Sequence, residues 1–290
     1  MSRIDALVRS GFSLSIELWP ARTEAAGERL AAALVALEAL RPSFASITYG
    51  AAGSTRTRTH QVVIDIQHGG HITPMAHLVC ASHTRAELVE ALSAYRDAGV
   101  ENVLALRGDP PLAAEGPLVA GELVHAIELV ELAKEIGRFC VAVAAHPEGH
   151  PDSGDLASDR RRLAEKLRVA DLAISQFFFE VGDYLRLVEE LSVLGVDKPV
   201  LPGIMPITNV RTLAKMAELS GCALPEAVTR RVEALGDQPA EVRKLGVEIA
   251  TELCGKLLGE GVPGLHFYTM NDAAATLEIC ANLGLTPPTR

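Results

Sequence analysis

The sequence lacks any apolar run long enough to cross a membrane. No segment reaches the roughly 18 uninterrupted apolar residues that a membrane-spanning helix requires. The N-terminal stretch, Met1 to Trp19, carries Arg3 and Arg9 and has Glu17 inside its apolar part, which is not the pattern of a secretory leader. We therefore expect a soluble, cytoplasmic protein.

Cysteine is scarce, and no two cysteines form a C-x-x-C pair. An odd number of widely separated cysteines predicts neither a disulfide framework nor a metal site. We interpret them as reduced, mostly buried thiols: Cys80, Cys140, Cys222, Cys254 and Cys280.

An excess of positive charge is also missing. The formal net charge is −10 at pH 7, which argues against nucleic acid or an anionic membrane as a partner. Local arginines and helix N-termini can still bind an anionic small molecule, so the net charge does not exclude an enzyme with an anionic substrate.

The dominant pattern is an alternation of short apolar runs with amphipathic segments. The predicted strands are 14–18, 44–49, 75–80, 103–106, 139–145, 172–178, 199–204 and 264–268. The helices that follow them are 23–40, 54–66, 84–98, 119–136, 155–168, 184–194, 209–219 and 273–283, with an extra pair at 225–235 and 240–258. Each strand followed by a helix predicts an α/β fold, a (β/α)8 TIM barrel that forms a single catalytic domain from the whole chain.

A doubly wound sheet is the alternative. That fold usually has fewer strands and a glycine-rich phosphate turn after the first one. No G-x-G-x-x-G occurs anywhere in the chain, and the first strand is followed by Trp19-Pro-Ala-Arg22. The barrel is therefore favoured.

Polar residues follow nearly every predicted strand. Because the carboxyl ends of barrel strands converge on one mouth, these side chains are expected to meet there. They are Glu17, Thr48, Tyr49, His77, Arg107, Asp109, His146, Glu148, Gln176, Tyr268 and Asn271.

Glu17 lies in an apolar context, Ile16-Glu-Leu-Trp19. A carboxyl in a partly apolar pocket has a raised pKa and can donate a proton near neutral pH. The alternative is that Glu17 forms an ion pair with Arg22 or Arg107.

Two other motifs invite less specific interpretations. The segment His146-Pro-Glu-Gly-His150 has loop-like spacing, which favours a structural or ligand-contacting role over a metal site. Gln176 precedes three phenylalanines and suits either a flat heterocycle with amide-like edges or the cap of a strand end.

Eight motifs in order resemble the bacterial methylenetetrahydrofolate reductase family over nearly the whole chain. They are Ser15-Ile-Glu-Leu-Trp-Pro-Ala-Arg-Thr23, Ser46-Ile-Thr-Tyr-Gly-Ala51 with Gly53-Ser-Thr55, Ala76-His-Leu-Val-Cys80, Leu104-Ala-Leu-Arg-Gly-Asp-Pro-Pro111, Val143-Ala-Ala-His-Pro-Glu-Gly-His-Pro151, Ile174-Ser-Gln-Phe-Phe-Phe179, Pro202-Gly-Ile-Met-Pro206 and His266-Phe-Tyr-Thr-Met-Asn271.

The resemblance implies a barrel that reduces 5,10-methylenetetrahydrofolate to 5-methyltetrahydrofolate with NADH or NADPH, usually through bound FAD. It implies that Glu17 is the general acid that opens the folate ring. Asp109 and Gln176 match folate-binding positions, and Tyr268 is taken as a third. Positions matching the flavin site, with His146 taken as a further cofactor-binding residue, are Thr48, Tyr49, Ala51, His77, Arg107, Gly108, Asp109, His146, His150, Asp159 and Lys166.

The chain departs from the family pattern mainly between residues 146 and 171. His146 stands where the family usually has Tyr, Arg162 where Asn is common, and Glu165 where a basic residue is common. A carboxylate near a diphosphate is repulsive unless neutralised. FAD is therefore doubtful, and hydride transfer directly from NAD(P)H is a second hypothesis.

A third hypothesis is a catalytically silent barrel that binds folate or a partner protein. It draws on Asp272, which stands where the family often has Arg. It also draws on the extra helices, whose apolar residues could serve the core or the interface of an expected homo-oligomer: Val242, Leu245, Ile249, Leu253 and Leu257.

Overall fold

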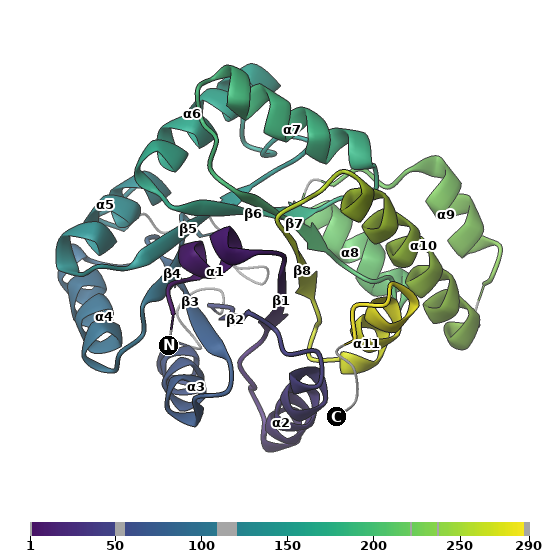
Figure 1. Cartoon of the computed structure of the whole chain (residues 1–290), viewed down its shortest axis with the longest axis horizontal. Helices are drawn as coiled ribbons and strands as arrows, with labels where there is room; N and C mark the ends of the chain where they lie inside the picture. The colour runs from purple at the N-terminus through teal and green to yellow at the C-terminus, as the bar shows by residue number, and fades with distance from the viewer. Residues whose placement is uncertain (1, 50–55, 109–120, 221, 237, 287–290) are drawn as a thin grey trace.

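The computed structural model describes residues 2–49, 56–108, 121–220, 222–236 and 238–286. Eight parallel strands close into a barrel in sequence order, and β8 returns to pair with β1 (Figure 1). The strands are β1 Ser13–Leu18, β2 Phe44–Ile47, β3 Thr73–Val79, β4 Asn102–Leu106, β5 Cys140–Ala145, β6 Leu172–Phe177, β7 Val200–Ile204 and β8 Gly264–Tyr268. The predicted (β/α)8 barrel is confirmed.

The helices surround the strands, as Figure 1 shows. Two further helices, α9 and α10, lie between the helix that follows β7 and strand β8. The bounds are α1 Ile4–Ser10, α2 Glu24–Glu38, α3 Arg56–Gly69, α4 Arg85–Asp97, α5 Ala126–Ile136, α6 Leu156–Val169, α7 Val181–Val193, α8 Val210–Ser220, α9 Glu226–Glu233, α10 Pro239–Gly259 and α11 Ala273–Asn282.

The strands are apolar because both of their faces are buried. Outward-facing residues such as Ile16 and Val103 pack against the helices in the largest apolar cluster. Inward-facing residues such as Phe44, Met75 and Leu104 fill the lower barrel in a second cluster. Polar side chains above this layer are therefore held at the upper mouth, where the strands end.

The helix α1 closes the lower end of the barrel, and the sequence pattern did not predict it. Ile4 and Val8 of α1 belong to the inner apolar cluster. The backbone N–H of Ile4 donates to Asn102 Oδ1 at 2.8 Å, which joins α1 to the start of β4. A seven-residue helix is too short to show a clear period in sequence.

The predicted start of the helix at 119–136 was wrong. Helix α5 begins at Ala126, whereas residues 121–125 are not helical, and 119 and 120 lie outside the described residues. The backbone at Gly121 packs so closely that a Cβ there would lie 2.2 Å from Cys80 O. Glu122 N–H donates to His83 O, so this segment binds the loop after β3 instead of coiling.

The apolar residues of α10 lie inside the chain. Val242, Ile249, Leu253 and Leu257 are buried, and Leu245 packs partly buried against the cluster that contains Val242. They therefore serve the core, and the homo-oligomer stays a prediction. Within the described part of the chain, no helix is both long and apolar enough to span a membrane.

Candidate active site

Strand β1 places Glu17 at the mouth of the barrel with its side chain directed inward. The residue is buried, with 8% of its surface exposed. Its Oε1 accepts a hydrogen bond from Trp19 Nε1 at 3.3 Å, and its Oε2 lies 3.6 Å from His77 Nε2. Burial raises the pKa of Glu17 to about 7, and the indole N–H opposes this rise. The carboxyl thus carries a proton that it can release near neutral pH.

The alternative ion pairs of Glu17 are not formed. Arg107 pairs instead with Asp152, at 2.7 Å. The structure gives no arginine contact to Glu17 among the described residues. The inference from the apolar sequence context, a raised pKa, agrees with this environment.

Neutral groups surround Glu17 inside the barrel. Burial lowers the pKa of His77 to about 3 and that of His266 to about 3, so both rings are uncharged near pH 7. The Tyr268 hydroxyl donates to Ser175 O at 2.7 Å, and burial raises its pKa well above the usual range. A Cβ at Gly203 would lie 2.6 Å from the Tyr268 ring, so glycine is what lets the tyrosine occupy this place.

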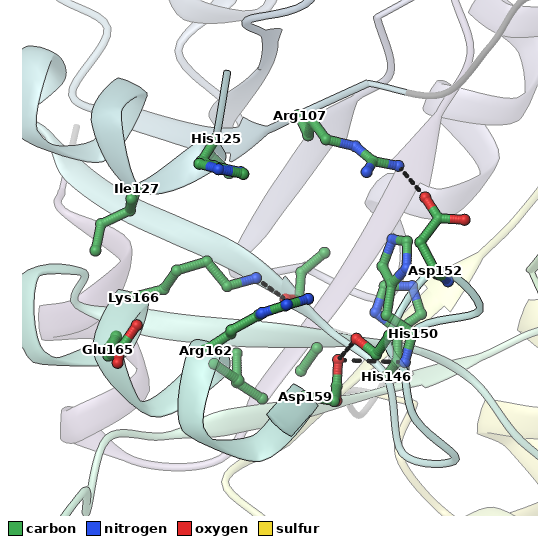
Figure 2. Close-up of a pocket in the computed structure, with 15 residues that line it drawn as sticks. Arg107, His125, Ile127, His146, His150, Asp152, Asp159, Arg162, Glu165 and Lys166 are labelled. Atoms are coloured by element: carbon green, nitrogen blue, oxygen red, sulfur yellow. Dashed lines mark hydrogen bonds and ion pairs between the residues drawn. The ribbon is translucent and has the colours of Figure 1, made fainter. Parts of the chain in front are cut away.

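A second group of polar residues lines a cavity of about 410 Å³ beside helix α6, here called the α6 cavity (Figure 2). The volume lies in the range of small-molecule sites. The polar residues lining it come from the end of β4, the start of α5, the loop after β5 and α6: Arg107, His125, His146, His150, Asp152, Ser153, Asp159, Arg162, Glu165 and Lys166.

Two histidines of the α6 cavity lie edge to face. The rings of His146 and His150 are 4.6 Å apart, and Figure 2 shows them beside Asp159. Burial, together with the charge of His150, lowers the pKa of His146 to about 4. Asp159 Oδ1 accepts from His150 N–H at 3.2 Å and Ser153 Oγ at 3.1 Å. The carboxylate therefore shapes the loop and does not point freely at a ligand.

Among the described residues that line the α6 cavity, cations and carboxylates are equal in number: Arg107, Arg162 and Lys166 against Asp152, Asp159 and Glu165. Asp159 is also paired from outside the lining with Arg160 at 2.9 Å, and that arginine is shared with Glu190. The Arg107 guanidinium bonds Asp152 and holds the pKa of that carboxyl below its usual range. Burial lowers the pKa of Lys166.

The remaining predicted residues lie around these two groups. The Thr48 carbonyl accepts from Thr59, and the Tyr49 hydroxyl is 2.9 Å from His83 Nε2. Gln176 Oε1 accepts from the next backbone N–H, that of Phe177, at 3.1 Å, which fits the strand-cap interpretation.

The structure brings part of the predicted set together. Five predicted cofactor positions, Arg107, His146, His150, Asp159 and Lys166, line the α6 cavity. Gly108 has a positive φ of +97°, whereas Ala51 and Asp109 lie outside the described residues.

Sequence reasoning missed His125 and Asp152 in the α6 cavity. Both stand in loops away from the strand ends, so the barrel pattern gave no signal for them. Within the described ranges, no group of three His, Cys, Asp or Glu residues could hold a metal.

The family model and the sequence relatives indicate one family. A family model described as methylenetetrahydrofolate reductase matches residues 3–284. A 5,10-methylenetetrahydrofolate reductase of Pectobacterium carotovorum is 35% identical over 283 residues, which cover 97% of this chain and 93% of that protein. Methylenetetrahydrofolate reductase (NADH) 1 of Arabidopsis thaliana is 34% identical over 286 residues, which cover 94% of this chain and 48% of the plant protein.

A solved structure shares the fold at low sequence identity. It is an uncharacterised Clostridium thermocellum protein that binds two copies of 5-methyl-5,6,7,8-tetrahydrofolic acid. It aligns with a TM-score of 0.65 at 15% identity over 98% of both chains. This likeness supports the barrel fold and nothing finer.

Proposed function

The chain belongs to the methylenetetrahydrofolate reductase family, and we propose that it reduces 5,10-methylenetetrahydrofolate to 5-methyltetrahydrofolate. The observation that carries this proposal is Glu17, a buried carboxyl with a pKa of about 7 at the mouth of the barrel. A general acid is most effective when its pKa lies near the working pH.

Glu17 supplies the proton in the proposed reaction. The protonated carboxyl gives its proton to an amine nitrogen of the folate five-membered ring, and the bond from that nitrogen to the methylene carbon breaks. The methylene carbon is then an electrophilic iminium that accepts a hydride from the nicotinamide ring. The indole of Trp19 holds one carboxyl oxygen by a hydrogen bond, and the neutral imidazole of His77 lies 3.6 Å from the other. Asp109, Gln176 and Tyr268 are proposed folate contacts.

The hydride source follows from the charge of the α6 cavity. The family generally uses a flavin together with NAD(P)H. A resident flavin must be held much more tightly than a cosubstrate, whose KM typically lies between about 1 μM and 1 mM. Its diphosphate would require surplus positive charge, whereas the described lining of the α6 cavity holds as many carboxylates as cations, and Arg107 is already paired with Asp152.

These residues do not fit a tightly held flavin. We therefore propose that NADH binds at the α6 cavity as a cosubstrate and delivers its hydride directly to the folate. NADPH is the less suitable donor, because its additional phosphate would meet no surplus positive charge in this cavity.

An absorbance spectrum and steady-state kinetics test this proposal. The purified protein should show no absorbance band at about 450 nm, the wavelength at which flavins absorb. It should oxidise NADH when methylenetetrahydrofolate is present as the hydride acceptor. Initial-rate plots should intersect, because both substrates are bound at once. A stoichiometric flavin band combined with parallel, ping-pong plots would contradict direct transfer.

A further inference from the structure

Trp19 stands beside the proposed proton donor at the mouth of the barrel. Its indole Nε1 donates to Glu17 Oε1 at 3.3 Å, while the residue remains 38% exposed. It is also the single tryptophan of the chain. A half-exposed aromatic side chain bonded to a buried acid is not explained by packing alone.

The end of β8 holds Trp19 in this position. Asn271 Oδ1 accepts from Trp19 N–H, and Asn271 Nδ2 donates to Trp19 O, both at 2.8 Å. Thr269 Oγ1 donates to the Glu17 carbonyl at 2.6 Å. Asn271 adopts φ +57°, a left-handed conformation that asparagine tolerates better than most residues. These bonds fix the backbone on both sides of Leu18, so the indole and the carboxyl stay aligned.

We propose that Trp19 is a positioning residue that controls how readily Glu17 releases its proton. The indole N–H can donate but cannot accept, so it favours the ionised carboxylate that remains after proton transfer. This inference deepens the proposed function and rests on the role of Glu17 as the proton donor.

The other groups that face Glu17 supply no comparable bond. His77 on β3 lies 3.6 Å from the second oxygen, beyond hydrogen-bond distance, and its Nε2 has no partner among the described residues. Tyr268 on β8 commits its hydroxyl to Ser175 O, and His266 bonds Ser15. All three are uncharged near pH 7, since burial shifts each pKa away from neutrality. Within the described residues, Trp19 is thus the hydrogen-bond donor to this carboxyl.

The tryptophan fluorescence of the unmodified protein reports this contact directly, because Trp19 is the single tryptophan of the chain. Without any substrate, the emission should titrate with a midpoint near pH 7 in the wild type as Glu17 ionises. The same titration should be absent from Glu17→Gln. A curve that is flat in the wild type, or identical in Glu17→Gln, would overturn the proposal.

A second variant alters the other end of the contact. Trp19→Phe keeps an aromatic ring but removes the N–H, so Glu17 should hold its proton to higher pH. The alkaline limb of the kcat/KM profile should move up by about one pH unit, the order expected for losing a hydrogen bond to a charged group. A purely structural role would lower activity without moving the limb, and a superimposable profile would overturn the proposal.

Phe12→Leu is the matched control. Phe12 is 44% exposed and precedes β1 at the opposite end of the barrel, so its profile should match the wild type. The fluorescence arm also separates the two proposals. A pH-dependent Trp19 signal without turnover of methylenetetrahydrofolate would reject the proposed function while leaving the Trp19–Glu17 contact intact.

Discussion

The carboxyl of Glu17 is harder to ionise than an exposed one, because burial raises its pKa from an ordinary 4.5 to about 7. Replacing it by Gln keeps the shape of the side chain but removes the transferable proton. We expect Glu17→Gln to lower kcat by about 10²–10⁴-fold, the usual contribution of a general acid. Activity that survives the change undiminished would reject the proton-donor role.

The same variant should be the more stable protein above neutral pH. Below about pH 4.5, Glu17 is neutral in both the folded and unfolded chains, so it adds no penalty. As the pH rises from about 4.5 to about 7, the unfolded chain ionises Glu17 while the folded chain keeps it protonated. The wild type therefore loses about 3 kcal/mol over this range, which Glu17→Gln retains. Urea unfolding of both proteins at pH 5 and pH 8 measures the difference. Equal stability at both values would mean that Glu17 is not buried as described.

At the scale of elements, helix α6 decides the charge of the cavity beside it. Glu165 is exposed on α6 and lines the cavity, so Glu165→Lys changes the local charge without disturbing the core. The substitution changes the local charge by two units. Near a surface, this alters the free energy of interaction with a diphosphate by roughly 1 kcal/mol, which is about fivefold in affinity. We expect the KM for NADH to fall by about that factor at low salt and by less at high salt.

Glu131→Lys on helix α5 is the matched control, since Glu131 is exposed but does not line the cavity. An equal fall in KM for both variants would point to net charge and not to the α6 cavity.

At the scale of the whole molecule, the two ends of the barrel have separate tasks. Asn102 at the lower end accepts from Ile4 N–H at 2.8 Å and donates to Pro74 O at 3.3 Å. Asn102→Ala would leave a buried N–H unpaired, so we expect a loss of about 2–4 kcal/mol in the free energy of unfolding. The kcat at 25 °C should change by less than about twofold, because catalytic groups of barrels lie at the other end. A large loss of kcat in the folded variant would contradict this division.

The sequence predicted the barrel because a strand buried on both faces leaves an unbroken apolar run, as in Val103 to Leu106. It also predicted that strand-end side chains such as Glu17 and His77 meet, since closure of a parallel barrel requires it. The bond between Arg107 and Asp152 could not be predicted, because the conformation of the loop after β5 is set by tertiary contacts such as those of Asp159. Helix α1 was not predicted for a similar reason, since its partners lie about a hundred residues away along the chain.

The closure of the lower barrel by α1 has a consequence for how substrates enter and products leave. Because Ile4 and Val8 close that end, we expect folate, dinucleotide and both products to enter and leave at the upper mouth of the barrel. Direct hydride transfer needs two large substrates seated there together, so whichever sits deeper must arrive first and depart last. The order of substrate binding would then follow from the closure of one end of the barrel. Product-inhibition patterns would show which molecule lies innermost.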